Sequence, residues 1–464
     1  MTPAFLRPLA LAVALVLTGC ATFSDDGGFG PAATAARERL GKEAVWVRTD
    51  AERGKAYEQT QALLAAPLDA DGAVQVALLN NAGLQARYAD LGIAEADYVQ
   101  ATRLPNPGFS FTRKSQGDVL KIDRAVTVGL IELLALPIAA RIESGRFAQA
   151  RLSAADAVLR QAQSTRRAWV DAVAAEQSAR YAEQVRHAAE TGALFARDLA
   201  RAGNVSALDH AREQAFYADA AAQAARARER AISAREALTR QLGLWGTGAQ
   251  YRLPERLPDL PGARPEMSDL EGYAIGNRLD LQAAKLQLDS LASSLGLTRA
   301  TRFIRVADVS YLHNSETGKP HENGYGIDIE IPLFDWGGAR VARAEAIYMQ
   351  AAAQLAEQAV NARSAVRERY ASWQIRYDVA RHYRDEVVPL RKRIGNENLL
   401  RYNGMLVSAF ELLADAREQI GAVNGYLDAQ RDFWLAESDL QDALGGSLPP
   451  APLAHSQEHQ EHQH

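Results

Sequence analysis

The side chains that could do chemistry are few, and the clearest group is a set of histidines near the C-terminal end. Imidazole nitrogens bind transition metals, so a short histidine-rich tract can capture such ions without an organised site. Segment 445–464 is expected to be disordered, and a polar tail without a ligand is the alternative interpretation. The four histidines are His455, His459, His462 and His464.

Nothing in the sequence predicts an enzyme. It contains no Gly-x-Ser-x-Gly, no phosphate-binding loop, no His-Glu-x-x-His and no pair of thiols. The formal net charge is -5 and there is no run of basic residues, which argues against a nucleic-acid partner. The remaining histidines show no metal-ligand spacing: His187, His210, His313, His321 and His382.

The single cysteine, Cys20, is the residue with the most specific context. One cysteine excludes an intrachain disulfide. Segment 1–19 has a basic start and a short apolar run, as a secretory signal peptide does. Leu-Thr-Gly before the cysteine resembles a bacterial lipobox, which implies cleavage there and lipid on the Cys20 sulfur and amine. By analogy, Ala21 at the next position favours the outer membrane. The alternative is an ordinary signal peptide with a chance cysteine, and no other cofactor is expected.

The elements that position these groups follow from an internal duplication. Segments 73–252 and 266–444 carry similar features in the same order, about 200 residues apart. A proline-rich linker, 253–265, joins the two halves, and segment 20–72 precedes them as an anchor and extended region. The repeated features are Leu84-Gln-Ala86 with Leu281-Gln-Ala283, Pro137 with Pro332, Ala211–Gln214 with Ala416–Gln419, and the helix breaks Gly203–Ser206 and Gly404–Ser408.

Each half is predicted to contain a strand pair. In the last strand Tyr325, Ile327 and Ile329 alternate with Asp328 and Glu330. Apolar and acidic residues that alternate strictly are typical of a strand with lipid on one side and water on the other. The two acids are then expected to face the lumen of a barrel. A soluble, half-buried strand is the alternative. The predicted strands are 107–114, 123–131, 303–313 and 324–333.

Very long helices follow each strand pair. A helix of about 60 residues would be about 90 Å long, far beyond the usual length in globular proteins. Such a helix needs packing partners, and the many alanines allow neighbours to approach closely. A wall of side-by-side helices fits this composition. The predicted helices are 139–201, 207–242, 339–400 and 408–444.

Four strands are too few to cross a membrane alone. Unpaired strand edges are costly in hydrocarbon, so only closed barrels span, and single-chain bacterial barrels begin at eight strands. No segment after the signal has about 18 consecutive apolar residues, so any crossing must be made by strands. The sequence therefore predicts a homo-oligomer without fixing the number of chains.

From Cys20 to about Leu444, the chain resembles the TolC family of outer-membrane factors, in its lipoprotein branch. The resemblance rests on the lipobox, the duplication, the paired helix breaks and the segment Ile331-Pro-Leu-Phe-Asp-Trp-Gly-Gly338. It implies a mainly α fold with transmembrane β structure. Three chains would share a 12-stranded β-barrel above a long α-helical periplasmic barrel. The implied partners are a periplasmic adaptor and an inner-membrane pump of the resistance-nodulation-division type.

The resemblance also assigns roles to the helix breaks, which form the periplasmic tip in the family. Glu411 and Asp415 lie four residues apart, hence on one helix face, and are gate candidates. Asp209, after the first break, is a weaker one. Solvated acids on a polar helix face are the alternative interpretation. Gly203 and Gly404 are expected to be structural first, because a tight turn between helices often needs a positive φ that glycine adopts cheaply. The residues that match the adaptor-docking turns are Gly203, Asn204, Val205, Gly404, Met405 and Leu406.

The function expected from this resemblance is a passive exit duct for small molecules or metal cations. The histidine tail would favour heavy-metal cargo, but drugs and dyes stay open. A coiled-coil lipoprotein without a pore is one alternative. The outer channel of a protein-secretion system is another, and Cys20 argues against it because such channels usually lack a lipid anchor.

Overall fold

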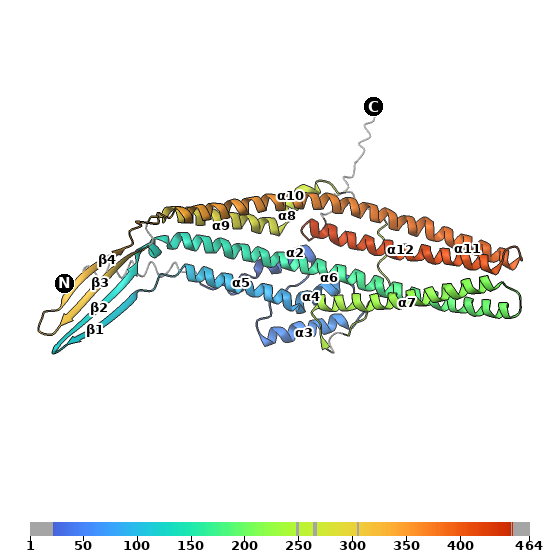
Figure 1. Cartoon of the computed structure of the whole chain (residues 1–464), viewed down its shortest axis with the longest axis horizontal. Helices are drawn as coiled ribbons and strands as arrows, with labels where there is room; N and C mark the ends of the chain where they lie inside the picture. The colour runs from blue at the N-terminus through green and yellow to red at the C-terminus, as the bar shows by residue number, and fades with distance from the viewer. Residues whose placement is uncertain (1–21, 247–249, 263–266, 304–305, 447, 449–464) are drawn as a thin grey trace, which may run out of the picture. The chain divides into compact units, whose positions relative to one another are not determined.

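The computed structural model describes residues 22–246, 250–262, 267–303, 306–446 and 448 (Figure 1). The expected signal peptide, Cys20 and the histidine tail lie outside the described residues. The chain forms two compact units, and each draws segments from both sequence halves. Unit 1 comprises Met1–Ala32, Ala86–Ala155 and Leu279–Val360, whereas unit 2 comprises Ala33–Gln85, Asp156–Arg278 and Asn361–His464. Within the described ranges, no helix is long and apolar enough to span a bilayer.

Unit 1 contains one four-stranded antiparallel sheet in the order β1-β2-β3-β4 (Figure 1). Gly117 and Gly318, both with positive φ, make the hairpin turns that glycine adopts without steric cost. The β2–β3 pairing joins the two sequence halves. The strands lie within a few residues of the expected positions, at Gly108–Gln116, Val119–Gly129, Ala307–Glu316 and Glu322–Ile329.

The segment around Pro137 differs from the expectation. We expected a strand to Ile131 with Pro137 after it, but β2 ends at Gly129 and helix α6, Leu130–Arg201, contains this proline. A short apolar run fits a strand or a buried helix equally well, so the pattern alone does not separate them. The long helix therefore begins nine residues earlier than expected and tolerates a missing hydrogen bond at Pro137.

Helices of unit 1 pack closely below the sheet. The glycine at position 145 of α6 lets Ser290 of α9 approach, because an added Cβ there would collide with the serine Oγ. Arg299 of α9 donates to Glu345 of α10 at 2.5 Å. The helices that contribute to this unit are α5 (Ala82–Ala101), α9 (Leu279–Ala300), and the adjoining parts of α6 and α10 (Gly338–His382).

Unit 2 is helical, and two of its apolar cores are large. One surrounds Trp169, whose indole N–H donates to the Leu68 carbonyl at 2.8 Å. The other surrounds Trp373 and Phe433. Each fully buried leucine in them contributes about 1.5–3 kcal/mol. This unit contains parts of α6 and α10 and most of α2 (Gly30–Leu40). It also contains the whole of α3 (Asp50–Leu64), α4 (Ala70–Asn80), α7 (Ala207–Leu242), α8 (Leu270–Asn277), α11 (Val388–Asn403) and α12 (Ala409–Ala443).

The helix expected at 339–400 is interrupted. A π-helical turn, Tyr383–Val387, separates α10 from α11. Pro389 follows directly and has no N–H to donate, which favours a local change in the helix hydrogen bonds. Gly425 of α12 leaves room for the Tyr383 ring, which an added Cβ would meet at 2.7 Å.

The described part of the proline-rich linker, 253–262, belongs to unit 2 and is bound to its helices. The Pro258 carbonyl accepts hydrogen bonds from Gln430 and Trp434 of α12, at 2.8 and 3.1 Å. The Pro261 carbonyl accepts from the Tyr377 hydroxyl at 2.9 Å. These bonds fix the connection between the halves against the second apolar core.

Candidate functional site

The two helix breaks have the same backbone geometry. At the α6–α7 turn, Gly203 N–H donates to Ala200 and Asn204 N–H donates to Leu199. At the α11–α12 turn, Met405 and Leu406 N–H groups repeat this pattern to Tyr402 and Arg401. This pair of bonds is the Schellman ending of a helix, in which one residue has a positive φ.

The residue with positive φ differs between the two turns. It is Gly203 at the first turn, with φ +75°, but Met405 at the second, with φ +59°. We expected glycine in both places, and that expectation was wrong for Gly404, which has φ −83°. A side chain in this conformation costs about 1–2 kcal/mol. Met405 and Leu406 are 93% and 78% exposed, so the turn presents two apolar side chains at its tip.

Each helix after a break begins with a serine cap. Ser206 Oγ accepts from the Asp209 N–H at 3.0 Å, and Ser408 Oγ accepts from the Glu411 N–H at 3.2 Å. Asp209 and Glu411 therefore occupy the same position in the two halves, where an acid is favourable at a helix N-terminus. Asp209 also accepts from Ser206 Oγ at 2.7 Å and pairs with Arg212 at 3.2 Å.

The acids expected at the gate differ in their surroundings. Asp415 lies one helical turn beyond Glu411 and accepts a hydrogen bond from Asn398 of α11, within its own hairpin. Glu411 is exposed, whereas Asp415 is half-buried. The second break is thus followed by one exposed and one partly enclosed acid.

A buried ion pair between α7 and α12 was missed by sequence reasoning. Arg417 donates to Glu213 at 2.5 Å, and the glutamate side chain is only 4% exposed. The guanidinium also stacks over the Phe216 ring at 4.4 Å. The signal was present, because Glu213 and Arg417 belong to the two copies of the duplicated Ala-Arg-Glu-Gln motif. Only the fold shows that the motifs meet.

One face of the sheet carries an exposed apolar band. The register aligns Phe109, Val126, Tyr311 and Tyr325 in one row across all four strands. Tyr325 is 82% exposed, and the other three are exposed as well. The next row consists of Val128, Val309 and Ile327. This face has no covering element within the described chain.

The opposite face is polar. Asp328 of β4 lies directly across from Asp308 of β3, and Lys114 and Lys121 reach Asp123 at 3.8 Å each. Glu330 follows the end of β4, and its N–H donates to the Val306 carbonyl at 3.2 Å. The face expected to carry acids alone therefore carries both signs of charge.

The apolar surface continues beyond the strands. Phe303 packs edge-on against Trp336, with ring centroids 6.3 Å apart. Aromatic rings at the rim of an apolar band suit a membrane interface. The large exposed apolar side chains in this region include Leu133, Leu134, Ile138, Ile331, Leu333 and Phe334.

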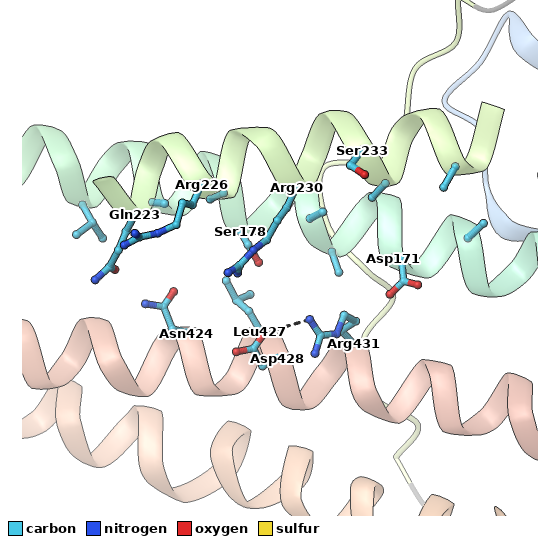
Figure 2. Close-up of a pocket in the computed structure, with 18 of the residues that line it drawn as sticks. Asp171, Ser178, Gln223, Arg226, Arg230, Ser233, Asn424, Leu427, Asp428 and Arg431 are labelled. Atoms are coloured by element: carbon cyan, nitrogen blue, oxygen red, sulfur yellow. Dashed lines mark ion pairs between the residues drawn. The ribbon is translucent and has the colours of Figure 1, made fainter. Parts of the chain in front are cut away.

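A groove of about 800 Å³ lies between α6, α7 and α12 (Figure 2). Arg226 and Arg230 extend from α7 toward α12, and Arg431 pairs with Asp428 at 3.4 Å (Figure 2). Small side chains, such as Ala174, leave the space open. None of the residues singled out from the sequence lines this groove.

No group of three or more His, Cys, Asp or Glu side chains in the described part of the chain is arranged to hold a metal ion. His313 and His321 stack with ring centroids 5.4 Å apart, which makes a pair only. The expected metal ligands of the C-terminal tail lie outside the described residues.

Comparisons with known proteins agree with this geometry. The family described as "Outer membrane efflux protein" matches residues 272–446. No curated protein matches the chain. The crystal structure of the outer membrane protein VceC from Vibrio cholerae has a TM-score of 0.68 at 17% identity, covering 82% of this chain and 96% of that one.

Two further solved structures are similar. CusC gives a TM-score of 0.66 at 17% identity, with 84% of this chain and 92% of that chain covered. The open-state MtrE channel of Neisseria gonorrhoeae gives 0.66 at 18% identity, with 81% and 88% covered. The chain therefore has the fold of these outer-membrane channels, and its residues 272–446 match the outer membrane efflux protein family.

Proposed function

We propose that this protein is the outer-membrane exit duct of a tripartite efflux system, through which cargo passes without chemistry. The observation that carries the proposal is the four-stranded sheet. It has one exposed apolar face, one polar face and two outer edges without a partner strand in the described chain. The strands have 8 to 11 residues, close to the length that crosses a bilayer at a tilt.

Closure of the sheet requires further copies of the chain. Strand edges in hydrocarbon leave polar groups unpaired, so β1 and β4 need partners. Because the four strands alternate in direction, β4 of one copy lies antiparallel to β1 of the next. A ring of copies therefore continues the same hydrogen-bond pattern. The resemblance to TolC-type channels supports three copies and 12 strands.

In such a ring the two faces take different roles. The row that contains Tyr325 meets lipid, and the row that contains Asp328 meets water in the lumen. Lys114 and Lys121 lie on the lumenal face with Asp123. Asp328 and Glu330 then solvate the lumen rather than selecting cargo. A pore of mixed charge suits a duct whose specificity is set by the pump.

We assign docking and gating to the two helix turns, which match the periplasmic tip in TolC-type channels. The exposed Met405 and Leu406 side chains offer an apolar contact for a periplasmic adaptor, with Asn204 and Val205 at the equivalent turn. Glu411 of each copy would approach its symmetry mates near the axis, with Asp415 and Asp209 behind it. Like charges repel until a partner compensates them, which couples opening to docking.

The anchor and the partners complete the proposal. Lipid on Cys20 would hold the protein in the outer membrane while the helices extend into the periplasm. An adaptor and an inner-membrane pump of the resistance-nodulation-division type would deliver drugs, dyes or metal cations. The coiled-coil alternative has no use for an amphipathic sheet, so the sheet favours the duct.

Single-channel conductance in planar bilayers tests the function. Purified lipidated protein is expected to form pores. Ile327→Lys places a charge on the lipid face and should abolish insertion, because a lysine at mid-bilayer costs about 2–4 kcal/mol in each copy. Asp328→Asn, one residue away on the other face, is the matched control and should insert normally. Folded oligomers that insert without conducting would overturn the proposal.

A further inference from the structure

The segment just after the expected lipid anchor is bound to unit 1 through a buried carboxylate. Both the backbone N–H and the hydroxyl of Ser24 donate to Glu95 Oε1, at 2.6 and 2.5 Å. Glu95 belongs to α5 and is only 4% exposed. A carboxylate removed from water needs such donors, because burying it without them is costly.

Residues 22–29, here called the N-terminal strap, are held at further points. Phe29 packs edge-on against the buried Tyr88 ring of α5, with centroids 4.8 Å apart. Gly28 lies against Phe147 of α6 so closely that an added Cβ would collide with that ring. Gly28 has φ +77°, so only glycine meets both requirements cheaply.

The strap also has a fixed internal shape. Asp26 accepts hydrogen bonds from the N–H groups of Gly28 and Gly30, at 2.9 and 2.8 Å. The second of these bonds reaches the first residue of α2. The strap is therefore tied to α5, α6 and its own following helix, and its first side-chain contact is at Ser24.

We propose that Glu95 is a positioning residue for the lipid anchor, because it holds the strap against α5 only a few residues after Cys20. This inference rests on the proposed lipidation of Cys20. Ser24 is the fourth residue after Cys20, so the lipidated residue stays within at most about 14 Å of this contact. Without the strap contacts, the chain would be free back to Gly30, with a reach of about 35 Å.

The consequence is a lipid that is fixed to unit 1, the unit that carries the amphipathic sheet. Anchor and sheet then enter the membrane with a defined spacing, rather than as two independent attachments. The partner of this surface is the periplasmic leaflet of the outer membrane. Its recognition needs no headgroup chemistry, because the strap only sets where the acyl chains begin.

Hydrogen exchange of the strap in the full, lipidated oligomer in nanodiscs tests the proposal. Glu95→Ala should make amides 22–29 exchange about 10- to 100-fold faster, as expected for losing hydrogen bonds to a charged group. Glu95→Gln should give a smaller increase, because its amide oxygen still accepts. Asp97→Asn, an exposed acid on the same helix, is the matched control and should change nothing.

A spin label at position 23 gives an independent readout, since Phe23 is exposed and tolerates replacement. The rotational motion of the label should be slow in the otherwise unaltered protein and fast in the Glu95→Ala variant. Ser24→Ala, which keeps the backbone bond, should give intermediate exchange and cannot disturb the α5 packing. Native-like exchange in both variants would overturn the proposal, as would a strap that exchanges at free-peptide rates in the unaltered protein.

Mass spectrometry of the N-terminal peptide distinguishes a failure of the positioning role of Glu95 from a failure of the proposed lipidation of Cys20. Acylated Cys20 with a strap insensitive to Glu95 refutes the positioning role alone. An unmodified Cys20 refutes the anchor itself, and with it any role of Glu95 in placing lipid. Loss of conductance in either variant is a distinct result and bears on the duct.

Discussion

The ion pair between Glu213 and Arg417 allows a quantitative test of what holds the two helical hairpins together. Arg417→Met removes the guanidinium and leaves the Glu213 carboxylate enclosed, since its side chain is 4% exposed. Breaking a buried pair costs about 3–5 kcal/mol. The Arg417 side chain is 33% exposed, so water screens part of this, and about 2–3 kcal/mol is the expected loss.

Hydrogen exchange of α7 and α12 near the pair measures this loss while the oligomer stays intact. A cost of 2–3 kcal/mol corresponds to roughly 30- to 140-fold more frequent local opening. The double variant Glu213→Gln/Arg417→Met should recover most of the protection, because no charge is then left buried. If the duct closes through these hairpins, the single variant should also raise the open probability in bilayers.

Arg391 and Glu418 supply the matched control. They pair at 2.9 Å on the neighbouring α11–α12 surface, but the Glu418 side chain is 62% exposed where that of Glu213 is buried. Arg391→Met should cost under about 1 kcal/mol, a few-fold in opening. Equal effects of the two arginine variants, or a double variant as unstable as Arg417→Met, would refute the reasoning that burial gives this pair its weight.

Three further outcomes are expected. Met405→Gly should stabilise the α11–α12 turn by about 1 kcal/mol, measured by local hydrogen exchange, because glycine adopts a positive φ freely. The same change should weaken the capture of a purified adaptor, because it removes an exposed apolar side chain. Unchanged capture would exclude the Met405 side chain from docking. Burial raises the pKa of Glu437, so stability falls as pH rises from about 4.5 through that raised value. Glu437→Gln should therefore raise the denaturant midpoint at pH 7 and have no effect below pH 4.5. Each unit by which the pKa is raised is worth about 1.4 kcal/mol of stability at pH 7. An equal gain at both pH values would show that ionisation of the buried carboxyl group is not what destabilises the protein. Arg226→Gln/Arg230→Gln in the groove should change stability by under about 0.5 kcal/mol in denaturant titration, as for exposed residues, and a larger loss would mean that these guanidiniums hold α12.

The strands and long helices could be predicted because their signals are local. Tyr325 and Ile327 alternate with polar neighbours, and residues 207–242, which contain neither proline nor glycine, coincide with α7. Leu130 and Ile131 continue the apolar run of β2, so they were assigned to the strand although they begin α6. The second turn was also misjudged, because a helix can end one residue later and place methionine where glycine is usual.

The missed sites depend on contacts between distant segments. Glu213 and Arg417 are two charges among many on long helices, and only packing shows that the glutamate is buried. Glu95 likewise looks like any helical acid until Ser24 is seen against it. The groove arises from the sizes of side chains on three helices, which no single segment records.

The pairing of β2 with β3 has a consequence for biogenesis. β2 ends at Gly129, and its partner begins only at Ala307, after both helices of the first half and the linker. During synthesis the first hairpin is complete long before β3 is made, and until then its amphipathic strands and both of its edges lack partners. Unpaired edges of this kind aggregate readily. Two separately expressed halves would each keep such an edge open, so we expect neither half to fold alone.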